Sequence, residues 1–388
     1  MFIVHVVRQF HPSVGGLENH VLDLAAAQVA AGNRVRVVTL DRLFNSGDQK
    51  TLPAREDLDG IEIVRVSYVG SSRYPIAPSA IRHIMQADVV HVHAIDFFFD
   101  YLAWTAPIHR RKLVVTTHGG FFHTPYATLL KRIWFSTITR LSSKFYAAVI
   151  ACSAQDFERF RQLRHPHLTM IEDGVNTSKF RDAAARTFRK SIVSIGRFSQ
   201  NKRVDLLVQF MRALTQQDPD WKLTIVGRPD DLQVSDVTAL IEAAGLANSV
   251  EVVASPDDET LRRVIGNSSF LASASDYEGF GMTAVEGMSA GLFPLLSDIP
   301  PFRRLVDRTG MGLLLDYKEP DQAVRGLLQN VAQITSLYDE NRTASIRAAA
   351  NYDWSSVSQK VADLYAAVSQ TEPAIADVPR QAQPSTRH

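Results

Sequence analysis

A chain of 388 residues is long for a single hydrophobic core, so its length predicts two domains of roughly 150 to 200 residues each. The composition, 45% hydrophobic and 21% charged, is ordinary for a globular protein and excludes a largely disordered chain. The formal net charge is +1. The chain holds one cysteine, Cys152, and a single cysteine excludes an internal disulfide and a cysteine-based metal site. A reducing compartment agrees with this, and we expect no nucleic-acid partner.

Charge is distributed unevenly along the chain. Residues 1–182 hold 21 Lys and Arg against 16 Asp and Glu, whereas the remainder holds 21 against 25. The basic half indicates an anionic partner such as a phosphate or a lipid surface, although a chance imbalance of solvated charges is the alternative. No apolar run reaches the ~18 residues of a membrane span, and the N-terminus lacks the pattern of a signal peptide. We therefore expect a cytoplasmic protein.

The first half alternates apolar runs with helical patterns. A strand at 2–7, a glycine-containing loop, a helix from about Leu17 to Ala31 and a strand at 35–40 form the sequence pattern of a right-handed parallel crossover. Later runs are apolar at nearly every position, which is typical of strands buried on both faces. They lie at 61–66, 88–93, 112–118 and 147–153.

The second half repeats this architecture without repeating the sequence. Its strands are predicted at 191–196, 222–227, 250–254, 269–275, 292–298 and 312–316. The α/β pattern predicts two Rossmann-like, doubly wound domains, 1–182 and 183–352, facing each other across a central cleft. A C-terminal helix at 353–370 is expected to return to the N-terminal domain, and 371–388 is expected to be a disordered tail.

Two glycines open the first helix, in the run Ser13-Val14-Gly15-Gly16-Leu17-Glu18. Glycine permits close backbone approach, and the amides at a helix start favour an anion, so Gly15 and Gly16 could cradle a diphosphate. A plain strand-to-helix turn is the alternative.

Cations follow the first strand of the second half. Gly196 and Arg197 begin a loop that also contains Lys202 and Arg203. An arginine fork and a lysine point charge suit phosphate oxygens, so Arg197 and Lys202 are candidates for binding a phosphorylated leaving group. Solvated loop charges are the alternative.

The stretch SDYEGFGMTAVEGMSAG at 275–291 puts two carboxylates around a glycine turn. Gly279 and Gly281 allow a ligand to approach the backbone, a helix is predicted from about Met282, and Gly291 is predicted to end it. Glu278 then lies in the turn, and Glu286 lies one to two turns into the helix.

These motifs, in this order and spacing, resemble the retaining glycosyltransferases of the GT-B fold, family 4. The resemblance covers residues 1 to about 370 and implies an enzyme that needs no cofactor and no metal. It implies that Arg197 and Lys202 bind the donor diphosphate as catalytic residues, and that Gly15 and Gly16 contact the diphosphate from the other domain.

The same resemblance assigns the sugar and the nucleoside. Glu286 would accept the ribose hydroxyls, and Glu278, with Gly279 and the amides of Phe280 and Gly281, would hold the transferred sugar. His118, which ends KLVVTTH, would contact the sugar and help to orient the acceptor.

Several segments are similar to one group within the family, the α-mannosyltransferases of xanthan- and acetan-type exopolysaccharide assembly. They are GSSRYPIAPS at 70–79, HAIDFFFDYLA at 93–103, THGGFFHT at 117–124 and LLSDIPPF at 295–302. The similarity implies retaining transfer of mannose from GDP-mannose to a polyprenyl-diphosphate-linked glycan acceptor, cellobiosyl-diphosphopolyprenol. Another nucleotide sugar or lipid-linked acceptor is the alternative, ahead of a GT-B epimerase or a non-catalytic nucleotide-sugar binder.

Two features depart from the family pattern or compete with it. Arg203 stands where family members commonly have glycine, which puts the conformation of that loop in doubt. A zinc site formed by His91, His93, His118 and His123 is the weaker alternative, because no carboxylate or cysteine completes a motif.

A basic and aromatic helix is predicted at 126–147. Arg132, Arg140 and Lys144 fall on one arc of it, beside Trp134 and Phe135. We interpret it as a peripheral contact with the cytoplasmic face of the inner membrane, where a lipid-linked acceptor would lie. Core packing of the aromatic residues, with solvated basic residues outside, is the alternative.

Overall fold

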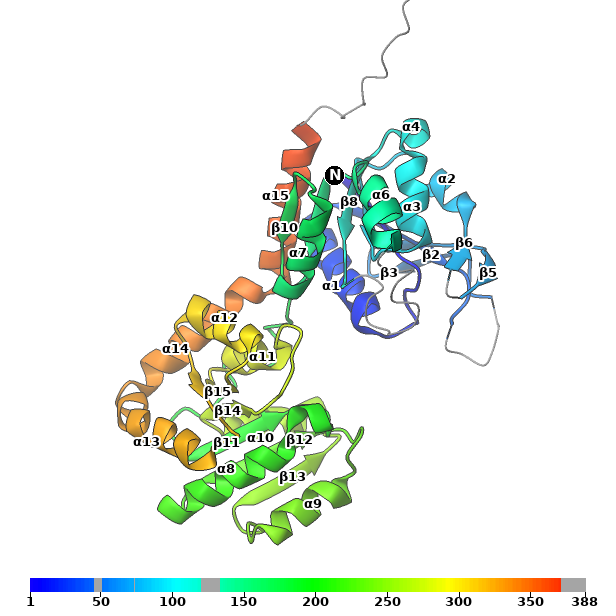
Figure 1. Ribbon diagram of the computed structural model, residues 1–388. Coiled ribbons are helices and arrows are strands. Elements are labelled where there is room, and N and C mark those ends of the chain that lie inside the picture. The colour runs from blue at the N-terminus through cyan, green and yellow to red at the C-terminus, as the bar shows by residue number, and fades with distance from the viewer. Residues whose placement is uncertain (45–50, 73, 120–132, 371–388) are drawn as a thin grey trace, which may run out of the picture. The chain divides into compact units, whose positions relative to one another are not determined.

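The computed structural model describes residues 1–44, 51–72, 74–119 and 133–370 (Figure 1). The chain forms two compact units: Met1–Ile171 with the C-terminal segment from Ser358, and Glu172–Val357. Residues 172–182, which the sequence pattern assigned to the first domain, pack in the second unit. There the amide of Val175 donates to Tyr352 O at 2.8 Å and that of Asp182 to Ser289 O at 3.0 Å.

The first unit is built on an eight-stranded sheet of order β10-β9-β8-β7-β1-β2-β4-β3. All neighbours are parallel except β3, which runs antiparallel to β4 at the edge. The strands are β1 (Phe2–Val6), β2 (Arg34–Leu40), β3 (Arg55–Leu58), β4 (Ile61–Val66), β7 (Val89–His93), β8 (Lys112–Thr116), β9 (Ala148–Ala151) and β10 (Leu168–Met170).

Helices and a small ribbon complete this unit. The ribbon pairs β5 (Val69–Ser71) with β6 (Tyr74–Ile76). The helices are α1 (Gly16–Ala30), η1 (Pro78–Ala80), α2 (Ile81–Ile84), α3 (Phe97–Trp104), α4 (Ala106–His109), η2 (Phe135–Thr139), α6 (Arg140–Ser143), α7 (Ala154–Phe160) and η3 (Arg161–Leu163). The last helix, α15 (Trp354–Gln370), drawn in red in Figure 1, belongs to this unit from Ser358 onward.

The second unit is built on a six-stranded parallel sheet of order β13-β12-β11-β14-β15-β16. The strands are β11 (Ser191–Ile195), β12 (Lys222–Gly227), β13 (Val250–Ala254), β14 (Phe270–Ser273), β15 (Phe293–Ser297) and β16 (Leu313–Leu315). The helices are η4 (Gln200–Lys202), α8 (Val204–Gln217), α9 (Val234–Ala243), α10 (Asp258–Gly266), α11 (Met282–Ala290), α12 (Pro300–Thr309), α13 (Pro320–Ser336), α14 (Tyr338–Ala349) and η5 (Ala350–Tyr352).

Both sheets are covered on both faces. In β11, Ile192 and Val193 are fully buried yet belong to different apolar clusters, because successive side chains point to opposite faces. In the first unit, the neighbouring residues Val6 and Val7 likewise belong to different apolar clusters. The prediction of doubly wound parallel sheets is confirmed, and every strand predicted from an apolar run is present.

Some predicted features lie outside the described residues. These are the tail at 371–388, His123 and Arg132, and most of the predicted helix before residue 133. Within the described residues, no helix combines the length and hydrophobicity that crossing a bilayer requires.

Candidate active site

The strand order of the second unit reverses between β11 and β14, and the candidate site lies at this point. Loops that leave the carboxyl ends of parallel strands on either side of such a reversal diverge, which opens a crevice for ligands. The loop after β11 contains Arg197 and Lys202, and the loop after β14 contains Glu278. Together with the loop after β12 they line a pocket of about 690 Å³.

Glycines allow these loops to come close. A β-carbon on Gly196 would lie 3.2 Å from Cε of Lys202, so the lysine stem packs across this glycine. A β-carbon on Gly227, at the end of β12, would overlap the carbonyl oxygen of Gly196. Gly227 therefore has no room for a side chain, whereas a side chain at position 196 would displace the stem of Lys202, whose amine lies in the pocket.

The predicted catalytic lysine is paired with the predicted sugar-binding glutamate. Nζ of Lys202 lies 2.7 Å from Oε1 of Glu278, and Oγ of Ser275 donates to the same oxygen at 2.7 Å. Both charged side chains are largely buried, with 21% and 16% of their surface exposed. The carboxylate in the glycine turn is therefore held by side chains of the protein.

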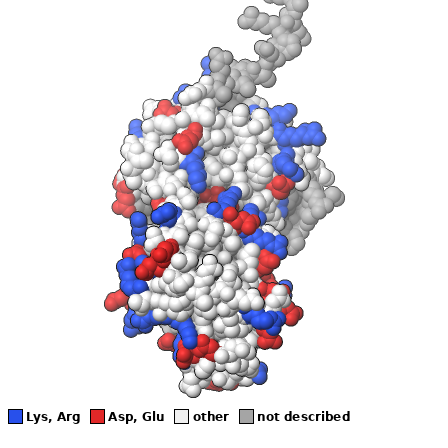
Figure 2. Space-filling view, turned by 90° about the vertical axis from the view of Figure 1, so that its left-hand side faces the viewer, with Lys and Arg blue, Asp and Glu red and all other residues white. Residues whose placement is uncertain are grey.

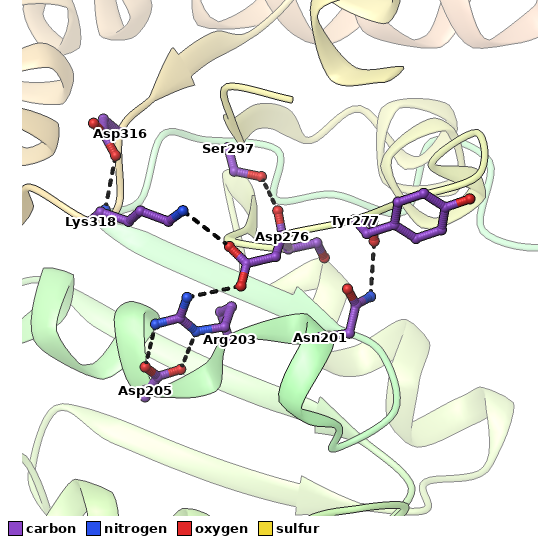
Figure 3. Close-up of polar contacts among 9 residues, drawn as sticks. Asn201, Arg203, Asp205, Asp276, Tyr277, Ser297, Asp316 and Lys318 are labelled. Atoms are coloured by element: carbon purple, nitrogen blue, oxygen red, sulfur yellow. Dashed lines mark hydrogen bonds and ion pairs between the residues drawn. The ribbon is translucent and has the colours of Figure 1, made fainter. Parts of the chain in front are cut away.

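Two further hydrogen bonds join the two loops near this pair. Asn201 Nδ2 donates to Tyr277 O at 2.9 Å (Figure 3). The amide of Asp276 donates to Asn201 O at 3.0 Å. These bonds fix the position of Lys202 relative to Glu278 before any substrate binds.

Arg203 adopts the conformation that favours glycine. Its φ angle is 50°, in the left-handed region, directly before α8. Its guanidinium pairs with both oxygens of Asp205, at 3.0 and 2.8 Å, and with Asp276 at 2.9 Å, while Lys318 approaches Asp276 at 3.6 Å (Figure 3). The loop thus keeps its left-handed turn without glycine, and the added cation is neutralised by neighbouring carboxylates.

Arg197 is paired with a residue that the sequence analysis missed. Its Nη1 lies 2.5 Å from Oδ2 of Asp230, in the loop after β12, and its side chain is 59% exposed. The sequence contains a pattern that could have identified Asp230. The charged residues Arg228, Asp230 and Asp231 directly follow a predicted strand, and that strand neighbours β11. An anion that enters the pocket would compete with Asp230 for this guanidinium.

The helix after the glycine turn begins and ends as predicted. Gly281 has φ 95° and precedes α11, and Gly291, also at φ 95°, follows its last residue. A β-carbon on Gly281 would lie 2.7 Å from the ring of Phe302. The Phe280 ring packs against Tyr352, with centroids 5.3 Å apart, which leaves the backbone of this turn for a ligand.

Glu286 lies in the second turn of α11 and is partly buried. Burial raises the pKa of this carboxyl, and Lys179 partly opposes the shift. Among the described residues no side chain forms a hydrogen bond or ion pair with it. A partly buried carboxylate without such partners can accept hydrogen bonds from the hydroxyls of a ligand.

The remaining predicted residues lie in the first unit. Gly16 begins α1, and Gly15 precedes it in an extended conformation. The carboxylate of Glu18 lies so close over Gly15 that a β-carbon there would overlap it, and Ser13 Oγ donates to Glu18 at 3.4 Å. The acidic side chain lies against the start of the helix, where exposed amides favour negative charge.

His118 lies two residues after the end of β8, in a left-handed conformation with φ 46°. Its Nε2 lies 3.1 Å from His93 Nδ1, its Nδ1 lies 3.8 Å from Cys152 Sγ, and its ring contacts that of His20 on α1. The first unit therefore brings His118 close to the helix that Gly16 begins. A strained backbone at a strand end is typical of functional positions.

The histidines weighed as a zinc site cluster more extensively than the sequence showed. Ring nitrogens of His5, His91 and His93, and of His20, His93 and His118, lie within 4.8 Å of one another. Both ring nitrogens of His5, His91 and His93 form hydrogen bonds within the protein. The geometry is that of a hydrogen-bonded chain.

The segment Asp218-Pro219-Asp220 forms the turn between α8 and β12. Asp218 directly follows α8, and Lys190 pairs with Asp218 at 2.7 Å and with Asp220 at 3.4 Å. Its carboxylates are neutralised away from the pocket.

Comparison with protein families assigns both units. Residues 14–179 match Glycosyltransferase Family 4, and residues 176–343 match Glycosyl transferases group 1. Relatives named GDP-mannose:cellobiosyl-diphosphopolyprenol α-mannosyltransferase share 42% identity in Komagataeibacter xylinus and 44% in Xanthomonas campestris. Those alignments cover 94% of this chain and 92% and 96% of the relatives.

Solved structures share the architecture at low sequence identity. Anabaena Alr3699/HepE in complex with UDP is 18% identical, with a TM-score of 0.69 over 95% of this chain and all of the other. A glycosyltransferase from Rickettsia africae is 17% identical, with a TM-score of 0.69 over 96% of this chain and 99% of the other. These similarities concern the fold alone.

Proposed function

The chain belongs to glycosyltransferase family 4 and has the GT-B fold, and from this premise we propose that it transfers mannose from GDP-mannose to a polyprenyl-diphosphate-linked glycan. The relatives at 42–44% identity carry this activity in their names. Within the chain, one observation carries the proposal. A lysine and a glutamate, preorganised at 2.7 Å, stand in a pocket at the switch point of the second sheet.

In the proposed mechanism, Lys202 and Arg197 hold the diphosphate of the donor. Negative charge grows on the diphosphate as the bond from the sugar C1 to oxygen breaks, and fixed cations stabilise that charge more than they stabilise the ground state. The lysine amine has three donor hydrogens, so it can keep its bond to Glu278 while it binds a phosphate oxygen. Arg197 exchanges Asp230 for the diphosphate.

Carboxylates in the same loop and helix bind the hydroxyls of the donor. Glu278 accepts from the sugar and Glu286 from the ribose. Because Oε1 of Glu278 already accepts from Lys202 and Ser275, this carboxylate is held as a binding group rather than as a nucleophile. The acceptor oxygen bonds to C1 on the face that the diphosphate leaves, and its proton passes to the departing phosphate, which retains the anomeric configuration.

The test is transfer of radiolabelled mannose. We expect lipid-soluble label from GDP-[¹⁴C]mannose with cellobiosyl-diphosphopolyprenol, and none from UDP-glucose. Replacing Lys202 by Ala should lower kcat by ~10² to 10³. The matched control is Lys190→Ala, because Lys190 pairs only with Asp218 and Asp220 among the described residues. Donor binding without transfer to this acceptor would contradict the proposed acceptor.

We further propose that the first unit docks on an anionic membrane surface. Exposed apolar side chains gather on α3, α4, η2 and α6 and on residues beside them; they are Trp104, Ile108, Ile133, Trp134, Leu141 and Phe145. Ser142 links two of these elements, because it accepts from Trp104 Nε1 at 3.0 Å and donates to Asp100 at 2.6 Å. Phe135 is buried, so the core-packing alternative describes this one aromatic residue.

Charge supports the same surface. Residues 101–150 hold seven Lys and Arg and no Asp or Glu. Arg140 and Lys144 are exposed beside the apolar residues. On the face of the molecule shown in Figure 2, by contrast, basic and acidic side chains are intermixed. Aromatic residues with nearby cations are typical of helices that bind the lipid interface.

Liposome flotation tests this docking. Reversing Arg140 and Lys144 to Glu should reduce the affinity for anionic vesicles, measured by flotation, by at least about thirtyfold, since each cation near such a surface contributes ~1 kcal/mol and two are lost. Arg212 and Lys222, exposed in the second unit, serve as the control pair for the same reversal. Equal flotation of both double variants would contradict a membrane contact at this surface.

A further inference from the structure

A connected set of buried polar side chains lies behind His118 in the first unit. It joins His5 on β1, His91 and His93 on β7, Gln28 on α1 and Tyr365 on α15. His5 is opposite His91 in the register of the two strands, so these histidines face the same side of the sheet. Each of the five side chains is at most 1% exposed, so they satisfy one another rather than bond to water.

One branch of this set runs from Gln28 to His118. Oε1 of Gln28 lies 2.7 Å from Nε2 of His5, and Nδ1 of His5 lies 2.9 Å from Nε2 of His93. Nδ1 of His93 then lies 3.1 Å from Nε2 of His118. Three hydrogen bonds in series thus connect a helix residue to the predicted sugar-contacting histidine.

The other branch runs away from His118. Nε2 of Gln28 donates to Tyr365 Oη at 3.4 Å, and that oxygen lies 2.6 Å from Nδ1 of His91. Nε2 of His91 ends the branch at Thr116 Oγ1, 2.7 Å away. Gln28 is therefore the branch point.

Proton positions along the set are coupled. Burial lowers the pKa of His5 to about 4 and lowers the pKa values of His91 and His93 well below the ordinary value, so all three rings are neutral at neutral pH. A neutral imidazole has one donor and one acceptor nitrogen, so the proton position on one ring fixes the next. The Gln28 oxygen can only accept, which places the proton on Nε2 of His5.

Because each neutral ring has one donor and one acceptor nitrogen, the proton on Nε2 of His5 also determines the tautomers of His93 and His118. His5 Nδ1 then accepts from His93 Nε2, and His93 Nδ1 accepts from His118 Nε2. The lone pair of His118 is thereby placed on Nδ1. A thiol can donate to that atom, which matches Cys152 Sγ at 3.8 Å.

We propose that Gln28 and Tyr365 are positioning residues that set the tautomer of His118 through His5 and His93. The consequence for catalysis rests on the proposed function: Nδ1 of His118 is the acceptor atom of the ring, and it accepts a hydrogen bond from a hydroxyl of the donor sugar in place of the long contact with the Cys152 thiol. Rotating the Gln28 amide by half a turn would reverse every proton of the set and make Nδ1 a donor. Tyr365 is bonded to both Gln28 and His91, so the same rotation would also move the proton of His91. The tautomers of all the histidines in the set therefore change together.

Long-range ¹H–¹⁵N spectra of protein labelled with ¹⁵N-histidine identify the protonated ring nitrogen of each histidine. In the wild type at pH 8 we expect His5, His91, His93 and His118 each as a single Nε2–H tautomer. Mixed tautomers, or Nδ1–H throughout, would overturn the proposal. So would a metal ion bound by His20, His93 and His118, because it would remove these N–H signals.

The variant Gln28→Glu makes a sharper test, since both oxygens of the new carboxylate accept. Tyr365 must then donate to it, so His91 changes to Nδ1–H, while His5 and His118 keep Nε2–H. An unchanged His91 would contradict the coupling. No purely structural role of Gln28 produces this split between the two branches.

Tyr365→Phe keeps the proposal testable if Gln28→Glu folds poorly. Without its acceptor the Gln28 amide can rotate alone, so His118 should become a mixture of tautomers. We expect kcat to fall about tenfold while KM for GDP-mannose changes by less than about twofold. The matched control is Tyr146→Phe, which removes another buried hydroxyl of the same unit, bonded to Phe99 O at 2.9 Å outside this set.

The outcomes separate this inference from the proposed function. The spectra need no substrate, so the expected tautomers in a protein that transfers no mannose would contradict only the proposed function. A protein that transfers mannose but shows mixed tautomers would contradict only the proposal that Gln28 and Tyr365 set the tautomer of His118. Equal effects of Tyr365→Phe and Tyr146→Phe on tautomer and kcat would also overturn it.

Discussion

Arg203 occupies a backbone position at which an L-amino acid is strained. Its left-handed conformation costs about 1 to 2 kcal/mol relative to glycine, and its partly exposed ion pairs with Asp205 and Asp276 return about 1 kcal/mol at most. We expect Arg203→Gly to unfold with nearly the wild-type free energy and Arg203→Ala to be about 1 kcal/mol less stable than Arg203→Gly. Urea unfolding of the three proteins measures both differences.

The same pair of variants tests whether the added cation serves the donor. Arg203 lies outside the lining of the pocket in the described part of the chain, and carboxylates neutralise it. Both variants should bind GDP within about twofold of the wild type. A loss of an order of magnitude would show that Arg203 itself contacts the nucleotide.

Glu286 is expected to lower the stability of the folded protein and to raise its affinity for the nucleotide. Its pKa is raised in the folded protein, so the neutral form is favoured there, and the stabilising contribution present at low pH is lost as the pH rises through the folded pKa. Glu286→Gln should therefore melt at a higher temperature than the wild type at pH 8, with the difference vanishing near pH 4. Its affinity for GDP should fall about tenfold, because an amide replaces a charged acceptor.

Calorimetry and nucleotide titration at the two pH values check this prediction. A variant that melts higher but binds GDP as the wild type does would remove Glu286 from the nucleotide site. A variant that binds weakly without the gain in melting temperature would show that burial does not destabilise this carboxylate.

At the scale of elements, the start of α11 depends on one glycine. Gly281→Ala adds strain at φ 95° and a β-carbon 2.7 Å from Phe302, so it should cost about 2 to 4 kcal/mol. Gly310→Ala is the matched control, because Gly310 has φ 65° but no neighbour within 4 Å and should lose only about 1 kcal/mol. Chemical unfolding of the two variants isolates the clash with Phe302, and equal losses would contradict it.

The elements that sequence reasoning found and missed differ in burial. Strands such as β7 and β11 are buried on both faces and read as continuous apolar runs. The missed strand β3, with the sequence REDL, pairs on one side only and has no buried residue, so it has no apolar signature. The short strands β5, β6 and β10 were missed for the same reason. The first two form a two-stranded ribbon and β10 lies at a sheet edge.

The site was predictable where its residues follow predicted strands. Lys202 and Glu278 were identified in this way, but their mutual ion pair was not, because 76 residues separate them and only the sheet order brings them together. Gln28 and Tyr365 could not be found at all. They are separated by 337 residues, and neither type of residue signals a histidine relay.

For the whole molecule, the distribution of histidine separates the acid responses of the two units. The sequence from Glu172 to Val357 contains no histidine, whereas the first unit buries His5, His91 and His93 with lowered pKa values. These rings stay neutral when folded and gain protons when unfolded, so stability falls as the pH drops from about 6.5 towards 4. Each ring contributes up to about 1.4 kcal/mol per pH unit in that window.

Hydrogen exchange with mass spectrometry at pH 8 and pH 5 resolves the two units by their peptides. We expect protection at pH 5, corrected for the intrinsic exchange rate, to fall selectively in β1, β7 and β8. The second unit is the internal control. Equal losses in both units would show that carboxylates rather than these histidines dominate the acid response.

The hydrogen bond from Val175 to Tyr352 has a consequence for how such a chain can be recombined. It places the beginning and the end of the second unit side by side, reinforced by the pairing of Val175 with Asp353 and by the hydrogen bond from Thr177 to Asp353. Topologically, residues 172–357 are therefore an insert in a host chain that resumes within α15, at Ser358. An insert whose ends meet can be excised, or exchanged for a counterpart with a different nucleotide preference, without rerouting the host.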